Sequence, residues 1–370
     1  MNPVKPNALL FDLTDSHTTP LDRAFRMEEL ASLVETLGSV SVVGKISRRA
    51  KIDLKTFVTS NTITELLVEA KEKEVKTIIF GNVMKPRQIY ELSEIFRPAK
   101  IEVWDKIDLI LKIFSLHAQS SEAKLQIELA KIRHMGPRIF GMGDELSRQG
   151  GGARGRGIGE TNTEVMKRHL RREELSIVEK LKKAEDTKAL QRERRKRDNF
   201  LTVALVGYTN AGKSFLMNRL SKKGVNVKDA LFETLDTRIG KIYLPMVQKE
   251  VLVSDTIGFI ADLPPHLISA FRSTLSESVH ADILLHIVDV SDPRRTEKIK
   301  VVDEILSTLG IAEKPQILIF NKTDKAKKRF GKTVLAKEYK LRTPLFCSAQ
   351  TGEGLEEIKA GLAKMAEASM

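Results

Sequence analysis

The first third of the chain alternates short apolar runs with stretches of helical periodicity. The apolar runs have the length and composition of buried strands and occupy 8–13 (ALLFDL), 40–46 (VSVVGKI), 76–80 (KTIIF) and 100–104 (KIEVW). Helices are predicted between them at about 22–37, 61–74 and 85–96, and a fourth begins near Asp105. Because strands that alternate with helices favour a parallel sheet, residues 1–118 are predicted to form an α/β domain.

Nothing in this first domain indicates catalysis. None of its strands runs into a glycine-rich phosphate loop, and no nucleophile stands beside a candidate base. A fold alone does not define a function, so we expect a binding or docking domain. Whether it binds a second nucleotide is left open by these residues.

Residues 119–198 have a different pattern, with few β-branched runs and many Glu, Lys, Arg and Leu. Apolar positions such as Leu125, Leu129 and Ile132 recur at helical spacing. A glycine-rich break, QGGGARGRGIG at 149–159, separates this stretch from a second helical one over about 161–197. Two helices joined in this way predict an antiparallel hairpin.

The last part of the chain contains a phosphate-binding loop. An apolar strand pattern at 200–206 is followed at once by Gly207-Tyr208-Thr209-Asn210-Ala211-Gly212-Lys213-Ser214, and Phe215 continues into a helix. The loop thus has its required context between a strand and a helix. Its backbone N–H groups would cradle phosphates, Lys213 would bring a cation to the β- and γ-phosphate oxygens, and the Ser214 hydroxyl would ligate Mg²⁺.

Two later loops identify the base as guanine. A strand at 315–320 ends in Asn321-Lys322-Thr323-Asp324. The Asp324 carboxylate can accept hydrogen bonds from the two donors on the Watson–Crick edge of guanine, a pair that adenine lacks. The last strand is followed by Ser348-Ala349-Gln350, where the Ala349 N–H can donate to the guanine carbonyl oxygen. The chain is therefore predicted to bind GTP and GDP.

A fourth motif lies between these loops. The strand VLVSDTIG leads to Asp255-Thr256-Ile257-Gly258, in which Asp255 would hold Mg²⁺ through water and the Gly258 N–H would contact the γ-phosphate. Ras-type GTPases place a water-orienting glutamine directly after this glycine, but the chain has Phe259, which cannot hydrogen-bond to water and is predicted to be a buried anchor.

The charge of the chain suggests a polyanionic partner. Lys and Arg number 62 against 49 Asp and Glu, which gives a net charge of +13 and a pI near 9.6. Residues 148–198 contain 16 Lys and Arg and nine Asp and Glu, so seven of the thirteen surplus charges lie there. Arg148, Arg154 and Arg156, in or beside the glycine-rich loop, are suited to phosphate contacts in RNA. The alternative is a solvated helical face.

Cysteine usage and hydropathy exclude other classes. Cys347 is the single cysteine, so no internal disulfide can form, and no Cys and His residues have zinc-ligand spacing. There is no run of eighteen apolar residues and no signal-peptide pattern in the first thirty. We expect a cytoplasmic monomer without an integral membrane segment. Peripheral membrane binding through 161–197 is a weaker alternative, since this helix lacks aromatic residues.

Taken together, these motifs resemble the HflX family of ribosome-associated GTPases over nearly the whole chain. The most specific stretches are 117–132 (HAQSSEAKLQIELAKI), 147–161 (SRQGGGARGRGIGET), 205–214 (LVGYTNAGKS), 255–277 (DTIGFIADLPPHLISAFRSTLSE) and 281–293 (ADILLHIVDVSDP). The resemblance implies an N-terminal α/β domain, a helical hairpin and a C-terminal Ras-like GTPase domain, divided as 1–118, 119–198 and 199–370. It also implies GTP hydrolysis coupled to the large ribosomal subunit and its RNA, with subunit separation or ribosome rescue under stress.

The resemblance extends to individual residues. Lys213, Thr234 and Gly258 are expected in catalysis, Ser214, Thr234 and Asp255 at Mg²⁺, and Phe232 at the nucleotide. The switch segment LFETLDTRIGKI is shorter than the family's F-A-T-L-D-P-T-T-R, so Thr237 is the alternative to Thr234. Asn210 matches the asparagine that helps hold K⁺ in related GTPases, although it could instead bond its own loop. The alternative function is a GTP-dependent RNA- or ribosome-binding module with negligible turnover.

Overall fold

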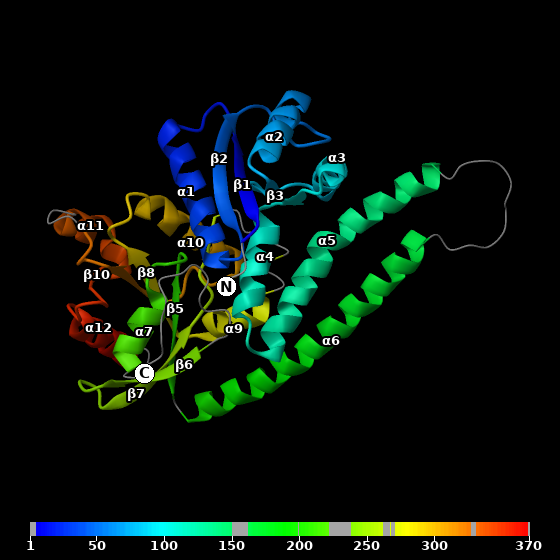
Figure 1. The fold of residues 1–370 in the computed structure, drawn as a ribbon. Coiled ribbons are helices and arrows are strands. Elements are labelled where there is room, and N and C mark those ends of the chain that lie inside the picture. Colours follow the sequence, from blue (N-terminus) through cyan, green and yellow to red (C-terminus); the bar gives the residue numbers. More distant parts are fainter. Residues whose placement is uncertain are drawn as a thin grey trace. The chain divides into compact units, whose positions relative to one another are not determined.

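The computed structural model describes residues 5–149, 162–198, 200–221, 238–261, 267, 271–326 and 331–368 (Figure 1). The chain forms two compact units. The first comprises Met1–Leu116 with Lys124–Lys180, and the second comprises His117–Ala123 with Leu181–Met370. The boundary between the units therefore crosses the helical segment, and the three-part division at 118 and 198 stays a prediction.

The N-terminal part of the first unit is the predicted α/β domain. Its strands are β1 (Asn7–Thr14), β2 (Ser41–Arg49), β3 (Val75–Phe80) and β4 (Glu102–Trp104), in the order β2-β1-β3-β4 with every pair parallel. The intervening helices are α1 (Pro20–Leu37), α2 (Ser60–Glu72) and α3 (Pro86–Phe96), with a short 3₁₀ turn η1 (Arg97–Ala99); α4 (Lys106–His117) follows β4. The parallel sheet is confirmed.

Local chemistry explains where these elements begin and pack. The Thr19 hydroxyl accepts a hydrogen bond from the Asp22 N–H, Pro20 starts α1, and Gly38 ends it with a φ of 66°. The apolar faces of β1 and β3 form a core in which Phe11 and Phe80 lie with ring centroids 5.1 Å apart. This core accounts for the short apolar runs of the sequence.

The two long helices form the predicted antiparallel pair. Helix α5 spans Ser121–Gln149 and α6 spans Asn162–Arg197. Within the first unit Arg133 Nε lies 2.8 Å from Glu174 Oε1, and within the second Lys188 Nζ lies 2.8 Å from Glu122 Oε1. From Arg133 to Glu122 the residue number falls along α5, whereas from Glu174 to Lys188 it rises along α6. The two helices therefore run in opposite directions, as Figure 1 shows. The hairpin prediction is confirmed.

The second unit contains a six-stranded sheet in the order β10-β9-β8-β5-β7-β6. Its strands are β5 (Leu201–Gly207), β6 (Arg238–Leu244), β7 (Lys249–Asp255), β8 (Ile283–Asp289), β9 (Gln316–Asn321) and β10 (Leu345–Phe346). The accompanying helices are α7 (Lys213–Ser221), α9 (Arg272–His280), α10 (Arg295–Thr308), α11 (Lys332–Glu338), η2 (Lys340–Arg342) and α12 (Leu355–Ala368). This is the α/β fold expected for the GTPase domain.

One strand of this sheet differs from the sequence interpretation. The sequence pattern places residues 231–242 in a switch segment, but Arg238–Leu244 forms β6, which pairs antiparallel with β7 at the edge of the sheet. The alternation of buried Gly240, Ile242 and Leu244 with outward-facing residues is the pattern of an edge strand with one packed face. Over the part of the chain that the structure describes, no helix is long and apolar enough to cross a bilayer.

Candidate nucleotide-binding site

The phosphate-binding loop joins β5 to α7, and its glycines are required by the backbone. Gly207 has a φ of 150°, and a Cβ atom there would lie 2.3 Å from the carbonyl oxygen of Ile287. Gly212 has a φ of 92°, and its Cβ would lie 2.4 Å from Nδ2 of Asn321. Any larger residue would push the loop away from the strands that support it.

Lys213, the first residue of α7, is folded back over this loop. Its Nζ donates to the carbonyl oxygens of Gly207 and Tyr208 at 3.1 and 3.0 Å. Burial lowers the pKa of its ammonium group to about 8, and the negative charge of Asp255 opposes that shift. The buried cation is therefore held by neutral carbonyl groups at the point where phosphate oxygens are expected.

The segment after β7 is attached to the phosphate-binding loop by backbone bonds. The Phe259 N–H donates to the Gly207 carbonyl at 3.1 Å, and the Thr209 N–H donates to the Phe259 carbonyl at 2.7 Å. A Cβ at Gly258 would lie 3.1 Å from Lys213 Nζ, so the Gly258 backbone passes close to the ammonium group. The Phe259 side chain is 1% exposed, which confirms the predicted buried anchor.

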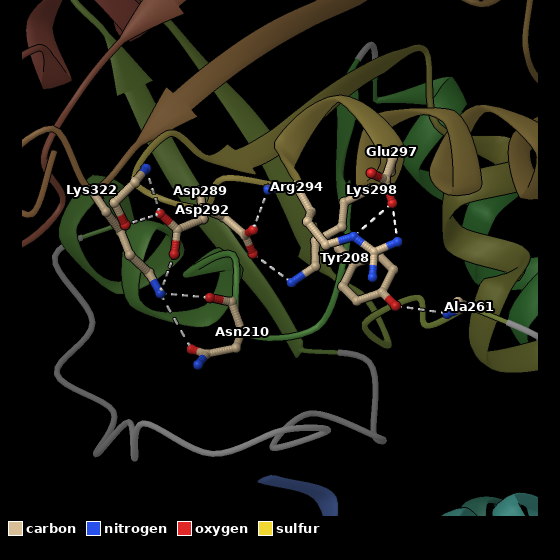
Figure 2. A network of polar contacts seen from close by, with 10 residues as sticks. Tyr208, Asn210, Ala261, Asp289, Asp292, Arg294, Glu297, Lys298 and Lys322 are labelled. Carbon is tan, nitrogen blue, oxygen red and sulfur yellow. Dashed lines mark hydrogen bonds and ion pairs between the residues drawn. The ribbon is translucent and has the colours of Figure 1, made fainter. Parts of the chain in front are cut away.

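Tyr208 adds a side-chain bond to this attachment. Figure 2 shows its hydroxyl oxygen accepting from the Ala261 N–H, at 2.9 Å. The Lys298 ammonium of α10 lies 4.7 Å from the centre of the Tyr208 ring and also contacts Asp292. From the sequence, Tyr208 was identified only as a residue of the loop. Its side-chain partners, Ala261 and Lys298, are distant in the sequence and no local pattern indicates them.

The predicted guanine-recognition motifs, 321–324 and 348–350, are connected to the phosphate-binding loop through Asn321. Asn321 donates from Nδ2 to the Ala211 carbonyl at 3.0 Å and accepts at Oδ1 from the Ala349 N–H at 3.0 Å. The Asp324 carboxylate accepts from the Ser348 hydroxyl at 2.5 Å. Three segments that are distant in the sequence thus meet at the carboxyl ends of β5, β9 and β10, which belong to the parallel part of the sheet, where open α/β sheets bind their ligands.

Asn210 is held by the lysine of the guanine-recognition motif. It has a φ of 59°, and Lys322 Nζ lies 2.7 Å from its carbonyl oxygen and 3.5 Å from its Oδ1. The same ammonium group forms an ion pair with Asp289 Oδ2 at 2.9 Å (Figure 2). Lys322 therefore makes its shorter hydrogen bond to the backbone carbonyl of Asn210, whereas its contact with the side-chain amide oxygen of Asn210 is long.

Ser214 and Asp255 fit a Mg²⁺ ion by their chemistry and their placement. Ser214 lies in the first turn of α7, and Asp255 is fully buried at the end of β7, beside Leu205 of β5. Hydroxyl and carboxylate oxygens are the hard ligands that Mg²⁺ takes. The Thr256 hydroxyl donates to the Leu205 carbonyl at 2.6 Å, so this side chain joins β7 to β5.

The remaining predicted residues fall into three groups. Phe215 lies in the first turn of α7, whereas Ile257 and Gln350 lie in the loops that surround the site, with Ile257 5% exposed. The others lie outside the described residues, namely Phe232, Thr234, Thr237, Arg154 and Arg156. Arg148 is in α5, but its side chain is not among those described. The RNA-binding and switch-threonine assignments therefore stay predictions.

A separate group of potential metal ligands has a structural explanation. His134 Nε2 lies 3.2 Å from Asp105 Oδ1 and 3.5 Å from Asp108 Oδ1. The two aspartates also cap α4 reciprocally, since each accepts a hydrogen bond from the backbone N–H of the other. We interpret this group as a helix cap with a histidine from α5 packed against it.

Comparison with known protein families matches three models along the chain. Residues 25–115 match a GTP-binding GTPase N-terminal model, 117–195 match a GTP-binding GTPase middle region, and 202–322 match a 50S ribosome-binding GTPase model. The first two models cover most of the α/β domain and of the helical pair, and the third covers most of the nucleotide-binding site described above.

Individual relatives agree with these models. The chain is 42% identical over 299 residues to GTPase HflX of Caldanaerobacter subterraneus, covering 80% of this chain and 69% of that protein. It is 35% identical to GTPase HflX of Escherichia coli, covering 90% and 77% of the two chains. Among solved structures, a complex of SsGBP and GDP superposes with a TM-score of 0.55 and 26% identity, covering 98% of each chain.

Proposed function

Because this chain belongs to the HflX family of GTPases, it binds and hydrolyses GTP, and we propose that its GTP form docks on the large ribosomal subunit. The observation that supports this partner is the surplus of seven positive charges in 148–198. Most of this region, residues 162–197, forms the long helix α6. Docking of the GTP form would then separate subunits or rescue ribosomes under stress.

The geometry suggests how the residues act on GTP. We propose that Lys213 exchanges its carbonyl partners for β- and γ-phosphate oxygens and neutralises charge that develops in the transition state. Gly258 would present its N–H to the γ-phosphate, and Asp324 would select guanine. Ser214 and Asp255 would hold Mg²⁺, with Thr234 as the third ligand; when bound, the ion supplies positive charge at the phosphates.

Phe259 has no group that could orient the attacking water, so hydrolysis by the isolated protein should be slow. We propose two sources for the missing contribution. One is contact with the large subunit, which would order the switch segments around the γ-phosphate. The other is a K⁺ ion held with help from the Asn210 amide oxygen. We expect the ribosome to make the larger contribution to the rate of hydrolysis, because the positive charge of 148–198 favours an RNA partner independently of the family resemblance.

The K⁺ contribution predicts a salt-specific rate. Hydrolysis should be faster in potassium than in sodium at equal ionic strength, and Asn210→Ala should abolish the difference while leaving the backbone bond to Lys322 in place. Asn210→Gly is the matched control, because it removes the same amide oxygen without placing a side chain at a φ of 59°. If both variants keep the potassium preference, Asn210 does not hold the ion.

The predicted RNA-binding loop should influence how binding depends on salt. Neutralising Arg154 and Arg156 together should weaken binding to ribosomes and reduce the slope of log affinity against log salt by roughly two, since each arginine would neutralise about one phosphate. Affinity for GDP should stay unchanged, since neither residue lies in a nucleotide motif. Equal binding of the variant and the parent at every salt concentration would assign the loop another role.

The proposed function as a whole is tested by sedimentation with purified subunits. Large subunits should carry the protein into the pellet with a non-hydrolysable GTP analogue and less so with GDP, and they should raise the steady-state rate of hydrolysis. The alternative, a binding module with negligible turnover, predicts the same sedimentation without any stimulation. Absence of nucleotide-dependent sedimentation would contradict both.

A further inference from the structure

The helix that follows the Asp255–Gly258 motif is held by the end of α6. Arg195 Nη1 lies 3.0 Å from Glu277 Oε2 of α9, and Arg192 Nη1 lies 3.4 Å from the hydroxyl of Ser276. Arg192 is itself fixed by Glu185, two turns earlier on α6, at 2.6 Å. All of these residues belong to the second unit.

These contacts are mostly buried. The side chains of Glu277 and Arg195 are 9% and 21% exposed, and the neighbouring Ser278 is fully buried. A carboxylate in such a place requires its partner, since an unpaired buried charge is costly, whereas exposed ion pairs contribute little. The Arg195 to Glu277 pair therefore restrains where α9 can lie against α6.

Packing on this side of α9 is incomplete. A pocket of about 210 Å³, partly open to solvent, lies between α6, α9 and the sheet, and residues that line it include Arg192, Arg195, Val203, Leu252, Glu277 and Ala281. A cavity removes the dense side-chain contacts that normally fix a helix. The polar contacts with α6 consequently carry more of the positioning of α9 than they would in a filled interface.

The other end of the same segment is anchored at the phosphate-binding loop. Phe259 forms the backbone bonds to Gly207 and Thr209, and Ala261 bonds to the Tyr208 hydroxyl. The segment that begins at Gly258 thus has one attachment at the phosphate-binding loop and a second, through Ser276 and Glu277, at α6. Helix α9 is followed by Asp282, whose N–H donates to the Thr202 carbonyl of β5 at 2.9 Å, and β5 runs into Gly207, the partner of Phe259. Displacing α9 would therefore disturb the support of the chain that carries Gly258.

We propose that Arg195, supported by Arg192, is a positioning residue for GTP hydrolysis, which acts through Glu277 and α9 on the placement of the Gly258 segment. It does not touch the nucleotide. The proposal concerns the hydrolysis step of the protein alone and does not depend on a ribosomal partner. It assigns α6 a part in the GTPase unit in addition to its place in the helical pair.

The test is a charge exchange in the full chain. Arg195→Glu and Glu277→Arg should each lower kcat for GTP by about tenfold, the size expected for a coupled contact pair. The double variant, which restores opposite charges in reversed order, should recover kcat to within about threefold of the parent. Affinity for a fluorescent GDP analogue should change by less than about twofold in all three, because the phosphate and base contacts are intact.

Arg194→Glu is the matched control. Arg194 precedes Arg195 on α6 and is exposed. The Arg194→Glu variant undergoes the same change of charge as Arg195→Glu, and its kcat should equal that of the parent. Glu277→Gln, which keeps the shape of the side chain, should also lower kcat. The proposal fails if Arg194→Glu loses as much kcat as Arg195→Glu, if the double variant shows no recovery, or if GDP affinity and melting temperature fall in parallel with kcat.

Discussion

GTP hydrolysis should fall to a barely measurable rate in Lys213→Ala. The ammonium group lies within 3.1 Å of two loop carbonyls and close to the Gly258 backbone. Removing one charge-assisted hydrogen bond costs about 1.5–3 kcal/mol, so nucleotide affinity should weaken by about 10-fold to 150-fold. Single-turnover hydrolysis and titration with a fluorescent GDP analogue measure the two effects separately.

Lys213→Arg is the control for this variant. It keeps the positive charge but carries a planar, bulkier group into a buried position, so binding should recover more than hydrolysis does. The melting temperature of each variant checks that α7 still forms. If Lys213→Ala hydrolyses GTP at the parent rate, the loop between β5 and α7 is not the catalytic one.

The base preference should change in Asp324→Asn. An amide in place of the carboxylate keeps one acceptor oxygen but presents an N–H donor to the second donor of guanine, so GTP affinity should fall by about 100-fold or more. Xanthine carries an oxygen where guanine carries its amino group, and the variant should gain binding of xanthosine triphosphate. Competition titrations with the two nucleotides provide the measurement.

Asp324→Ala separates recognition from support of the loop. Like any loss of the carboxylate, this variant removes the hydrogen bond from the Ser348 hydroxyl. Because alanine offers no donor to xanthine, GTP binding should be lost without any gain in binding of xanthosine triphosphate. Unchanged GTP affinity in Asp324→Asn would show that the base is recognised elsewhere.

Local sequence patterns were sufficient for most of the fold. The apolar run at 8–13 became β1, the run at 76–80 became β3, and the helical stretches on either side of the glycine-rich loop became α5 and α6. Each of these elements follows a regular spacing of apolar and polar positions that is visible in the sequence. Burial of Phe259 could likewise be predicted from its chemistry.

The contacts that join the site together could not be predicted in this way. Tyr208 and Ala261 are 53 residues apart, and Arg195 and Glu277 are 82 apart. Such pairs depend on how β5, α6 and α9 pack, which no local period specifies. Strand β6 was missed for a related reason, since it has one buried face, lies at the edge of the sheet and begins inside the segment assigned to the switch.

The length of α6 gives this helix a part in both units. A helix of 36 residues at a rise of 1.5 Å per residue is about 54 Å long. Its residues up to Lys180 belong to the first unit, where Glu174 pairs with Arg133, and its residues from Leu181 belong to the second, where Arg192 and Arg195 contact α9. One uninterrupted helix therefore carries both a contact of the first unit and the contacts that hold α9.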